Sequence, residues 1–365
     1  MALQEIQVTH VRNLAQVRLR DLGRVNVFYG HNGSGKTSIL EAIHLLGLAR
    51  SFRTSNIRSV ISHDRADCTV YAEVEGRGPM SVRRLGVKRD RTGGIELRLD
   101  RELQSSRAEL AAVLPLQIVH SESFMLISGS PRIRRQFIDW GVFHVEQSYA
   151  ETWQRFQKAL KQRNHLLRHG RIDQLDFWDE ELARCGSLIH EARQAYLVEL
   201  SPVFQQSLSA MDAGHELPEL VYRAGWDTTH ALGEALGSSR ASDVKQGFTQ
   251  PGPQRADVRF VISGKQASEV LSRGQQKLVL MALKLAQALV LARDKRMHCA
   301  FLIDDLPAEF DARRQAAVIE QLGAMQAQVF LTSIEREDIP LECIAHSGRS
   351  AAMFHVEHGR LSRTH

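Results

Sequence analysis

Cysteine is scarce in this chain of 365 residues, and no long hydrophobic run is present. The four cysteines are Cys68, Cys185, Cys299 and Cys343. They form no metal-ligand spacing, and nothing in the sequence indicates secretion. The N-terminal residues lack the basic and then apolar layout of a signal peptide. The most apolar stretch, Leu278–Ala292, contains Lys284 and Gln287 and is too short to cross a bilayer. We therefore expect a cytoplasmic protein.

Internal repeats and a coiled-coil arm are also lacking. Apolar residues make up 43% of the chain, which is enough to build real cores, and the length suits two or three domains or lobes. The formal net charge is +5, with an isoelectric point near 9.1. This basic balance permits binding to nucleic acid but is too mild to establish it.

A complete P-loop motif occupies Gly30–Thr37. Alternating apolar residues before it predict a strand that ends at Gly30, and helical spacing from Lys36 onward predicts a helix. Glycines would let the backbone N–H groups face a phosphate at the start of that helix. Lys36 would reach the β- and γ-phosphates, and the Thr37 hydroxyl would bind Mg²⁺. The predicted nucleotide-binding residues are Gly30, Asn32, Gly33, Ser34, Gly35, Lys36, Thr37 and Ser38.

Two carboxylates follow the apolar run Ala300–Ile303. Such a run is typical of a buried parallel strand, and ligands bind at the carboxyl ends of parallel strands. Asp304 would hold Mg²⁺ through its water shell, with Thr37 as the other side chain of the metal site. Asp305 would then orient or deprotonate the attacking water. Asp305 and Lys36 are thus the predicted catalytic residues.

The short segment Leu271–Gln275 opens a long segment with helical periodicity. Ser272 is a good N-cap, and Gly274 permits close approach of another backbone. This second helix N-terminus also suits an anion. Because one γ-phosphate rarely needs two such sites in one chain, we expect the second to serve the nucleotide of a partner copy. An ordinary capped helix is the other interpretation.

The order of these motifs resembles that of ABC-type ATPase heads, and in particular of the SMC-like ATPases of DNA repair. The resemblance covers nearly the whole chain. It includes Arg12–Leu14, Gly129–Trp140, Lys161–Asn164, Gly252–Pro253, Leu271–Gln275, Ile303–Asp305 and Glu309–Asp311.

This resemblance implies an ATP-dependent homodimer on double-stranded or gapped DNA. It implies slow ATP hydrolysis, with ATP and Mg²⁺ as cofactors, and help in loading RecA, with RecR and RecO as partners. It also assigns roles to motif residues. Ser272, Arg273, Gly274 and Gln275 would form the signature that acts in trans, and Asp311 would belong to the D-loop. Gln117 is a candidate sensor of the metal, and Thr332 and Ser333 take the place of a switch histidine.

The sequence departs from the family pattern at several positions. Gln254 stands where a histidine is often found, and Ala308 replaces a serine whose hydroxyl could touch the nucleotide of the partner copy. Pro307, just before it, is also unusual. The cross-dimer contacts of this chain can therefore differ in detail from those of the family.

The layout predicts an α/β fold, in which an ABC-type ATPase head with a mixed P-loop sheet and an antiparallel β flap receives an inserted helical lobe. Residues 1–110 would form the first part of the head, residues 111–250 the lobe, and residues 251–365 the second part. The head would resume near Ala256 with a strand over Val258–Ile262. The insert is too short for the arms of SMC proteins.

Basic residues gather in two parts of the predicted lobe. Lys158, Lys161 and Arg168 fall on one helical face, where a row of cations can follow phosphates. Arg132, Arg134 and Arg135 form the other group. Both groups are candidates for DNA contact. A solvated surface is the alternative for the first group, and pairing with acidic residues inside a lobe is the alternative for the second.

Two functions remain open on the sequence alone. In the first, ATP joins two heads on DNA and hydrolysis separates them, so that the ATPase is a weak, DNA-stimulated switch. In the second, a soluble ABC ATPase subunit couples ATP to a protein or transporter partner without DNA. Asp305 replaces the glutamate that is usual in transporters and is one methylene shorter, which predicts slow turnover.

Overall fold

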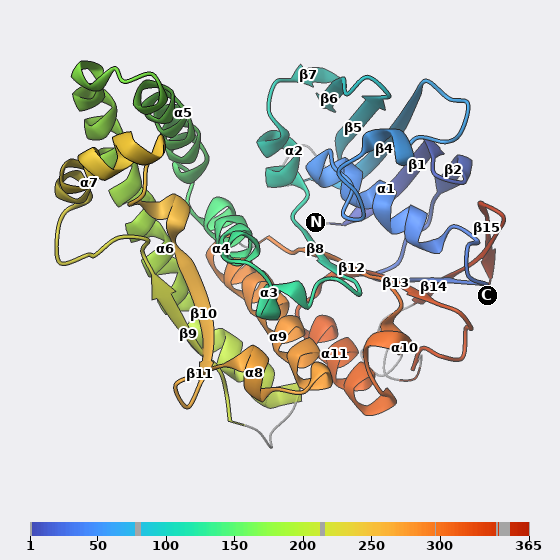
Figure 1. Cartoon of the computed structure of the whole chain (residues 1–365). Coiled ribbons are helices and arrows are strands. Elements are labelled where there is room, and N and C mark those ends of the chain that lie inside the picture. Colours follow the sequence, from blue (N-terminus) through green and yellow to red (C-terminus); the bar gives the residue numbers. More distant parts are fainter. Residues whose placement is uncertain are drawn as a thin grey trace. The chain divides into compact units, whose positions relative to one another are not determined.

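The computed structural model describes residues 2–76, 82–211, 216–295, 297–340, 342 and 351–364. Two compact units make up the chain (Figure 1). The first, called the P-loop unit, consists of Met1–Ser123 and Leu291–His365. The second, called the helical unit, consists of Phe124–Val290. Cys343 lies outside the described residues.

A mixed sheet of six strands carries the P-loop. Its strand order is β15-β14-β3-β13-β12-β8, and all neighbours are parallel except the antiparallel β14–β15 hairpin. The strands are β3 (Val25–Tyr29), β8 (Leu116–Val119), β12 (Ala300–Ile303), β13 (Gln328–Ser333), β14 (Ala351–Glu357) and β15 (Arg360–Thr364). Because β12 and β13 are fully buried, they consist mainly of apolar residues.

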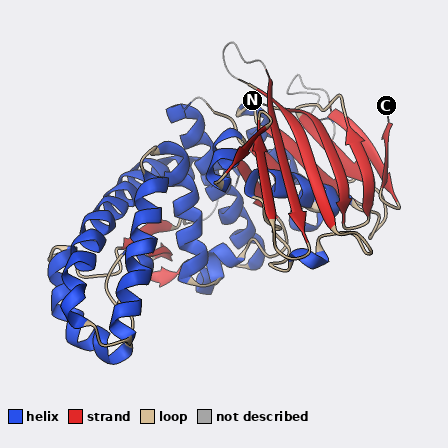
Figure 2. Ribbon diagram, turned by 90° about the horizontal axis from the view of Figure 1, so that it is seen from above, coloured by secondary structure: helices blue, strands red, loops and turns tan. Residues whose placement is uncertain are grey.

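A second sheet of six antiparallel strands belongs to the same unit, in the order β2-β1-β4-β5-β6-β7 (Figure 2). The strands are β1 (Leu3–Val11), β2 (Leu14–Leu19), β4 (Asp67–Glu75), β5 (Val82–Asp90), β6 (Ile95–Leu99) and β7 (Glu102–Gln104). Alternating burial along β4 shows that one face of this sheet packs on the core. The predicted β flap is thus part of a larger sheet that also includes the N-terminal hairpin.

Helix α1 (Lys36–Leu48) lies in the core of the P-loop unit. Its residues Ile39, Leu40, Ile43 and Leu46 are fully buried in one cluster with side chains from both sheets. Burying four such side chains stabilises the unit by roughly 6–12 kcal/mol relative to exposed side chains. The remaining elements are η1 (Ile57–Ser59), α2 (Arg107–Val113), α10 (Leu306–Glu309) and α11 (Ala312–Ala324).

Long helices and one small sheet make up the helical unit. The helices are α3 (Met125–Ser128), α4 (Pro131–Val145), α5 (Tyr149–Arg168), η2 (Ile172–Gln174), α6 (Leu175–Met211), α7 (Leu232–Gln246), η3 (Pro253–Arg255), α8 (Ala267–Val270) and α9 (Arg273–Lys295). The sheet has the order β11-β10-β9, with β9 (Glu219–Arg223), β10 (Asp257–Ile262) and β11 (Lys265–Gln266). The last residues of α9, from Leu291 onward, belong to the P-loop unit.

The division of the chain differs from the predicted boundaries at residues 110 and 250. Strand β8 pairs with β12, so residues up to Ser123 belong with the P-loop sheet. The strand over Val258–Ile262 exists, but it does not return the chain to the head as we expected, because β10 pairs with β9. The sequence pattern indicates that a strand forms but not which strand will be its neighbour.

Helix α9 is the one helix, within the described ranges, that is long and apolar enough to cross a membrane. It has 23 residues and is longer than the predicted apolar stretch. However, 72% of its most apolar window is buried inside the structure. Such burial is typical of the core helix of a folded domain.

Candidate nucleotide site and signature helix

The P-loop connects β3 to α1 in the P-loop unit. Gly30 has φ +143°, and a Cβ there would lie 2.3 Å from the carbonyl oxygen of Val356, so only glycine fits without displacing β14. Gly33 has φ +80°, with no heavy atom within 4 Å of where its Cβ would be. The loop therefore follows a backbone path that favours glycine beside open space.

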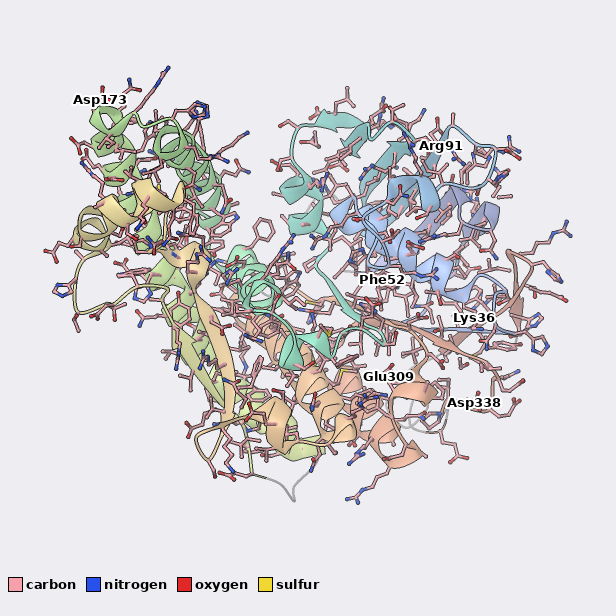
Figure 3. The ribbon with its side chains drawn as sticks, viewed as in Figure 1. Lys36, Phe52, Arg91, Asp173, Glu309 and Asp338 are labelled. Carbon is pink, nitrogen blue, oxygen red and sulfur yellow. The ribbon has the colours of Figure 1, made fainter. Side chains whose placement is uncertain are left out.

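Lys36 is the first residue of α1 and is labelled in Figure 3. Its ammonium group donates to the carbonyl oxygens of Gly30 and His31, the latter at 3.0 Å. Burial lowers the pKa of Lys36, and the charges of Asp305 and Asp304 partly oppose that shift. The cation is thus held within the loop, close to both carboxylates.

Thr37 and Asp304 meet although they are 267 positions apart in sequence. The Thr37 hydroxyl donates to Asp304 Oδ1 at 2.9 Å, with Oδ2 at 3.2 Å. Parallel β3, β13 and β12 produce this meeting, because their carboxyl ends lie at the same edge of the sheet. A hydroxyl and a carboxylate oxygen at this distance are the hard oxygen ligands that Mg²⁺ prefers.

Asp305 follows Asp304 in a left-handed conformation, with φ 55° and ψ 58°. Its backbone N–H donates to Thr332 Oγ1 at 2.7 Å, and the same hydroxyl donates to Asp304 Oδ1 at 2.9 Å. Burial raises the pKa of Asp305, and the neighbouring charge of Asp304 raises it further. A carboxyl group with a raised pKa is a better proton acceptor than an ordinary aspartate.

These residues share a pocket of about 690 Å³. Its lining includes Asn32, Gly33, Gly35, Lys36, Thr37, Ser38, Asp304, Asp305 and Thr332. Four arginines and a histidine also line it, namely Arg12, Arg53, Arg58, Arg91 and His63. An excess of cations around a P-loop suits a polyanion.

Sequence reasoning did not assign Arg53, Arg58, His63 or Arg91 to the site. Arg53 and Arg58 lie in the segment between α1 and β4. Arg91, which is labelled in Figure 3, follows β5. Arg58 donates to the carbonyl oxygen of Arg91 at 3.1 Å, so the segments are tied together. The one sequence signal is a third basic group, which falls on the predicted β flap and consists of Arg83, Arg84, Lys88, Arg89 and Arg91. This group does not by itself specify a position next to the P-loop.

The N-terminal hairpin supports the P-loop from the antiparallel sheet. Asn13 donates to the carbonyl oxygen of Ser34 at 3.1 Å and accepts from the Ser38 hydroxyl at 3.0 Å. Arg12 makes two hydrogen bonds of 2.8 Å to the buried carboxylate of Glu41. The motif Arg12–Leu14 therefore fixes the loop and the first turns of α1.

Two predicted site residues lie elsewhere. Gln117 in β8 is buried, at 1% exposure, and is not among the described residues that line the pocket. The Ser333 hydroxyl donates to the carbonyl oxygen of Glu335 at 2.8 Å. Of the two switch candidates, Thr332 alone lines the pocket.

The P-loop residues fit a nucleotide with Mg²⁺. The Ser34 hydroxyl is buried and has no hydrogen-bond partner in the structure, although buried hydroxyls are normally paired. Thr37 and Asp304 supply one hydroxyl and one carboxylate, and Mg²⁺ is usually bound by one or two side chains together with phosphate oxygens.

The signature segment forms a capping box at the start of α9. The N–H of Gln275 donates to Ser272 Oγ at 3.3 Å, and the N–H of Ser272 donates to Gln275 Oε1 at 2.8 Å. Ser272 and Arg273 are exposed. In the P-loop unit, Asp311 caps α11 by accepting from the N–H of Arg314 at 3.0 Å. Both motifs thus cap a helix, and Ser272, Arg273 and Asp311 remain exposed to solvent.

The two basic groups of the helical unit have different surroundings. Arg134 forms an ion pair with Asp257, with distances of 2.7 and 3.0 Å, and Arg135 donates to the carbonyl oxygen of Ala256 at 2.7 Å. Arg134 therefore pairs with an acidic residue inside the unit, which is the alternative that the sequence left open, whereas Arg135 bonds a backbone carbonyl. Arg132 is exposed.

Exposed cations of α5 line a groove of about 650 Å³. Its lining consists of Gln157, Lys158, Leu160, Lys161, Gln162, Asn164 and Arg168. The three cations all lie on the groove, and the rest of its lining is mostly polar. The groove therefore presents a row of cations along one helix, which can follow a phosphate backbone.

Comparison with known proteins agrees with this geometry. Residues 2–352 match the family described as the RecF/RecN/SMC N-terminal domain. The chain therefore belongs to this family of SMC-like ABC ATPases. It is 47% identical over 368 residues to the DNA replication and repair protein RecF of Pseudomonas putida strain W619, covering 100% of this chain and 99% of the relative. It is 46% identical to RecF of Pseudomonas syringae pv. syringae strain B728a, with the same coverage.

Solved structures show the same fold. The recombination mediator protein RecF-ATP in the RecFOR pathway matches with a TM-score of 0.87 and 25% identity, covering 100% of this chain and 98% of that one. An Smc head bound to the C-terminal winged-helix domain of ScpA matches with a TM-score of 0.59 and 13% identity, covering 100% and 97%. The expected fold class, an ABC-type ATPase head with an inserted helical lobe, is confirmed.

Proposed function

We propose that this chain is an ATP-driven DNA-binding switch of DNA replication and repair, in which ATP joins two copies on DNA and hydrolysis releases them. The observation that carries the proposal is the Thr37–Asp304 pair beside the P-loop, inside a pocket lined by cations. Support for the DNA part comes from the full-length similarity to proteins named DNA replication and repair protein RecF.

In this proposal the P-loop holds the triphosphate of ATP. Backbone N–H groups of Gly33 and Gly35 and the ammonium of Lys36 face the phosphates, and the Ser34 hydroxyl gains the partner that it lacks. Thr37 and Asp304 would hold Mg²⁺, which supplies charge stabilisation to the phosphate oxygens. Cations such as Arg12 and Arg53 add positive potential around the pocket.

Asp305 is proposed to accept a proton from the attacking water. The water oxygen bonds to the γ-phosphorus, the bond to the ADP oxygen breaks, and the proton passes to the Asp305 carboxylate. The short side chain of aspartate places water less well than glutamate would. We expect slow turnover, and Asp305→Glu should raise kcat in a steady-state ATPase assay. An unchanged or lower rate would rule out side-chain length as the cause.

The second half of each ATP site is proposed to come from the partner copy. The Ser272 oxygen accepts the Gln275 N–H, which leaves the hydroxyl proton free to donate to a phosphate oxygen. Arg273 and Gly274 would approach the same nucleotide, and Asp311 would lie at this contact between the two copies. ATP bridging two surfaces supplies differential affinity for the closed dimer, as a ligand-driven switch requires.

The DNA face is proposed to lie on the helical unit. Lys158, Lys161 and Arg168 line one groove and make no ion pair with a residue in the described part of the chain, whereas Arg134 and Arg135 are engaged inside the unit. We therefore assign duplex or gapped DNA to the groove, with Arg132 as a further contact. By similarity to proteins of the RecFOR pathway, we infer RecR and RecO as partners, RecA loading as the outcome, and a cytoplasmic, nucleoid-associated location.

Light scattering of the purified protein tests the proposal. We expect the mass to double with Mg²⁺-ATP, and a short duplex to strengthen the effect. Ser272→Arg should abolish doubling while still binding nucleotide, and Lys36→Arg should weaken the response by perturbing the P-loop. If the mass does not change with ATP, or if DNA does not strengthen the ATP-dependent increase in mass, an ABC subunit that couples ATP to a protein partner without DNA is favoured.

A further inference from the structure

The hydroxyl of Thr332 lies between Asp304 and Asp305, the two residues that follow β12. It is 1% exposed, and it has one bond on each side, to Asp304 Oδ1 at 2.9 Å and from the N–H of Asp305 at 2.7 Å. A carboxylate can only accept and an N–H can only donate. The single proton of the hydroxyl is therefore committed to Asp304.

This commitment separates Thr332 from the role that the sequence predicted for it. A switch residue would donate a hydrogen bond to the γ-phosphate. With its proton on Asp304, Thr332 has none to offer to a phosphate oxygen, although it lines the pocket. Its contacts instead lead to the backbone of Asp305.

Asp305 is a residue whose conformation has to be held. A left-handed conformation is unfavourable for most residues with a Cβ, and Asp305 adopts one, with φ 55°. The carbonyl oxygen of Asp305 accepts from the N–H groups of Ala308 at 3.0 Å and Glu309 at 3.3 Å. These bonds hold the carbonyl side of the residue, and Thr332 holds the N–H side.

We propose that Thr332 is a positioning residue for ATP hydrolysis: it fixes the backbone of Asp305 and ties it to Asp304, so that the Asp305 carboxylate faces the attacking water. The inference rests on the proposed function, in which Asp305 activates that water. Thr332 acts through Asp305 and does not touch the nucleotide. It follows that removing its hydroxyl should impair turnover and spare binding.

The test compares Thr332→Val, which keeps the shape and loses the hydroxyl, with Thr332→Ser, which keeps the hydroxyl. Tyr29→Phe is the matched control, because it removes a hydroxyl from β3 of the same sheet, where Tyr29 bonds Thr364 at 3.2 Å. ATP affinity is measured by titration with a fluorescent ATP analogue, turnover by phosphate release, and folding by thermal unfolding. Each variant is tested as the full chain.

We expect Thr332→Val to lower kcat by about ten- to a hundredfold, as one lost buried hydrogen bond permits, with the Kd for the analogue within about threefold of wild type. Thr332→Ser should restore kcat to within about threefold, and Tyr29→Phe should match wild type. Where Thr332→Val fails to fold, Thr332→Ala, which leaves room for a water, gives the same comparison.

Two results would overturn the inference. A weakened Kd with unchanged kcat would make Thr332 a phosphate contact, and unchanged values of both would leave it without a role in turnover. Asp305→Asn separates this failure from that of the proposed function. If Asp305→Asn hydrolyses ATP at the wild-type rate, Asp305 does not activate the water, and the inference about Thr332 fails with the proposed function. If Asp305→Asn is slow but Thr332→Val has the wild-type kcat, only the role of Thr332 is refuted.

Discussion

Three arginines of the P-loop unit and two of the helical unit lie in opposite environments. In the P-loop unit, Arg53, Arg58 and Arg91 line a pocket that is open to a ligand. In the helical unit, Arg163 and Arg193 are fully buried. Arg163 pairs with Asp179 and, at 2.6 Å, with Asp243, while Arg193 pairs with Asp139 at 2.8 Å.

The difference shows that arginine next to other polar residues is not by itself evidence of a binding surface. An unpaired buried charge is very costly, and the two fully buried arginines of the helical unit each have an aspartate partner. Arg58 and Arg91 line the pocket without a carboxylate partner among the described residues. Arg12 and Arg53 line it while paired with the buried carboxylate of Glu41.

The largest effect should follow from breaking an interior pair. Arg163→Met leaves the buried carboxylate of Asp243 without its cation and should destabilise the protein by about 3–5 kcal/mol. Chemical denaturation followed by circular dichroism measures this loss. Arg171→Met, at an exposed position, is the control and should change stability by less than about 0.5 kcal/mol. Equal stability of both variants would contradict the structural role of Arg163.

A cation of the pocket should matter for ligand binding and not for folding. Lys36→Ala removes a charged donor from the P-loop and should weaken ATP binding by about ten- to a hundredfold, the worth of one hydrogen bond to a charged group. Isothermal titration with Mg²⁺-ATP measures the affinity, beside Lys265→Ala as an exposed control. If Lys36→Ala instead unfolds the protein like Arg163→Met, the contrast between the two units is lost.

Exposed cations of the helical unit provide an intermediate case. Reversing Lys158 and Lys161 together to Glu should weaken duplex binding and lower the slope of log K against log salt by about 2, one for each lost phosphate contact. Fluorescence anisotropy at several salt concentrations gives this slope. The control reverses Arg223 and Lys245, which are exposed cations of the same unit outside the groove. If both double variants lose duplex affinity equally, the groove is an ordinary solvated surface and not a DNA-binding site.

The smallest effect concerns the carboxylate pair. The pKa of Asp305 is raised by burial and by Asp304, so ionisation of Asp305 is less favourable in the folded state than in the unfolded one. Its contribution to stability is full below the ordinary aspartate pKa and is lost as the pH rises through the raised value. Asp305→Asn should therefore raise the melting temperature slightly at pH 7 and leave it unchanged at pH 3.5. An increase in melting temperature of the same size at both pH values would refute the electrostatic origin. Asp173→Asn, at an exposed position, is the control.

Local patterns were sufficient to predict the P-loop, the strand before Asp304 and the start of α9, because each depends on residues that are adjacent in sequence. Strand partners were not predictable in this way. The strand over Val258–Ile262 was predicted, but its pairing with β9 was not. Alternation of apolar residues fixes which face is buried but carries no information on the neighbouring strand.

For the candidate site too, residues within local motifs were predicted and contacts between distant segments were not. Thr37 and Asp304 came from motifs, and the structure brings their oxygens to 2.9 Å. The contact of Thr332 with Asp305 was missed because it depends on the lateral register of β12 and β13, where Ile303 lies beside Leu331. For the same reason, the arginines around the pocket come from segments whose positions no local pattern specifies.

Strand β3, which leads into the P-loop, has β13 and β14 as its two neighbours, and both are encoded in the last tenth or so of the chain. During synthesis, β3 therefore emerges long before either strand that can pair with it. Ribosomes take on the order of ten to thirty seconds to add the residues of the helical unit that come between. A nascent chain accordingly has time to fold its helical unit first. It completes the P-loop sheet and its pocket only when its last strands have been made, so an interrupted translation product would carry the helical unit without the complete P-loop sheet.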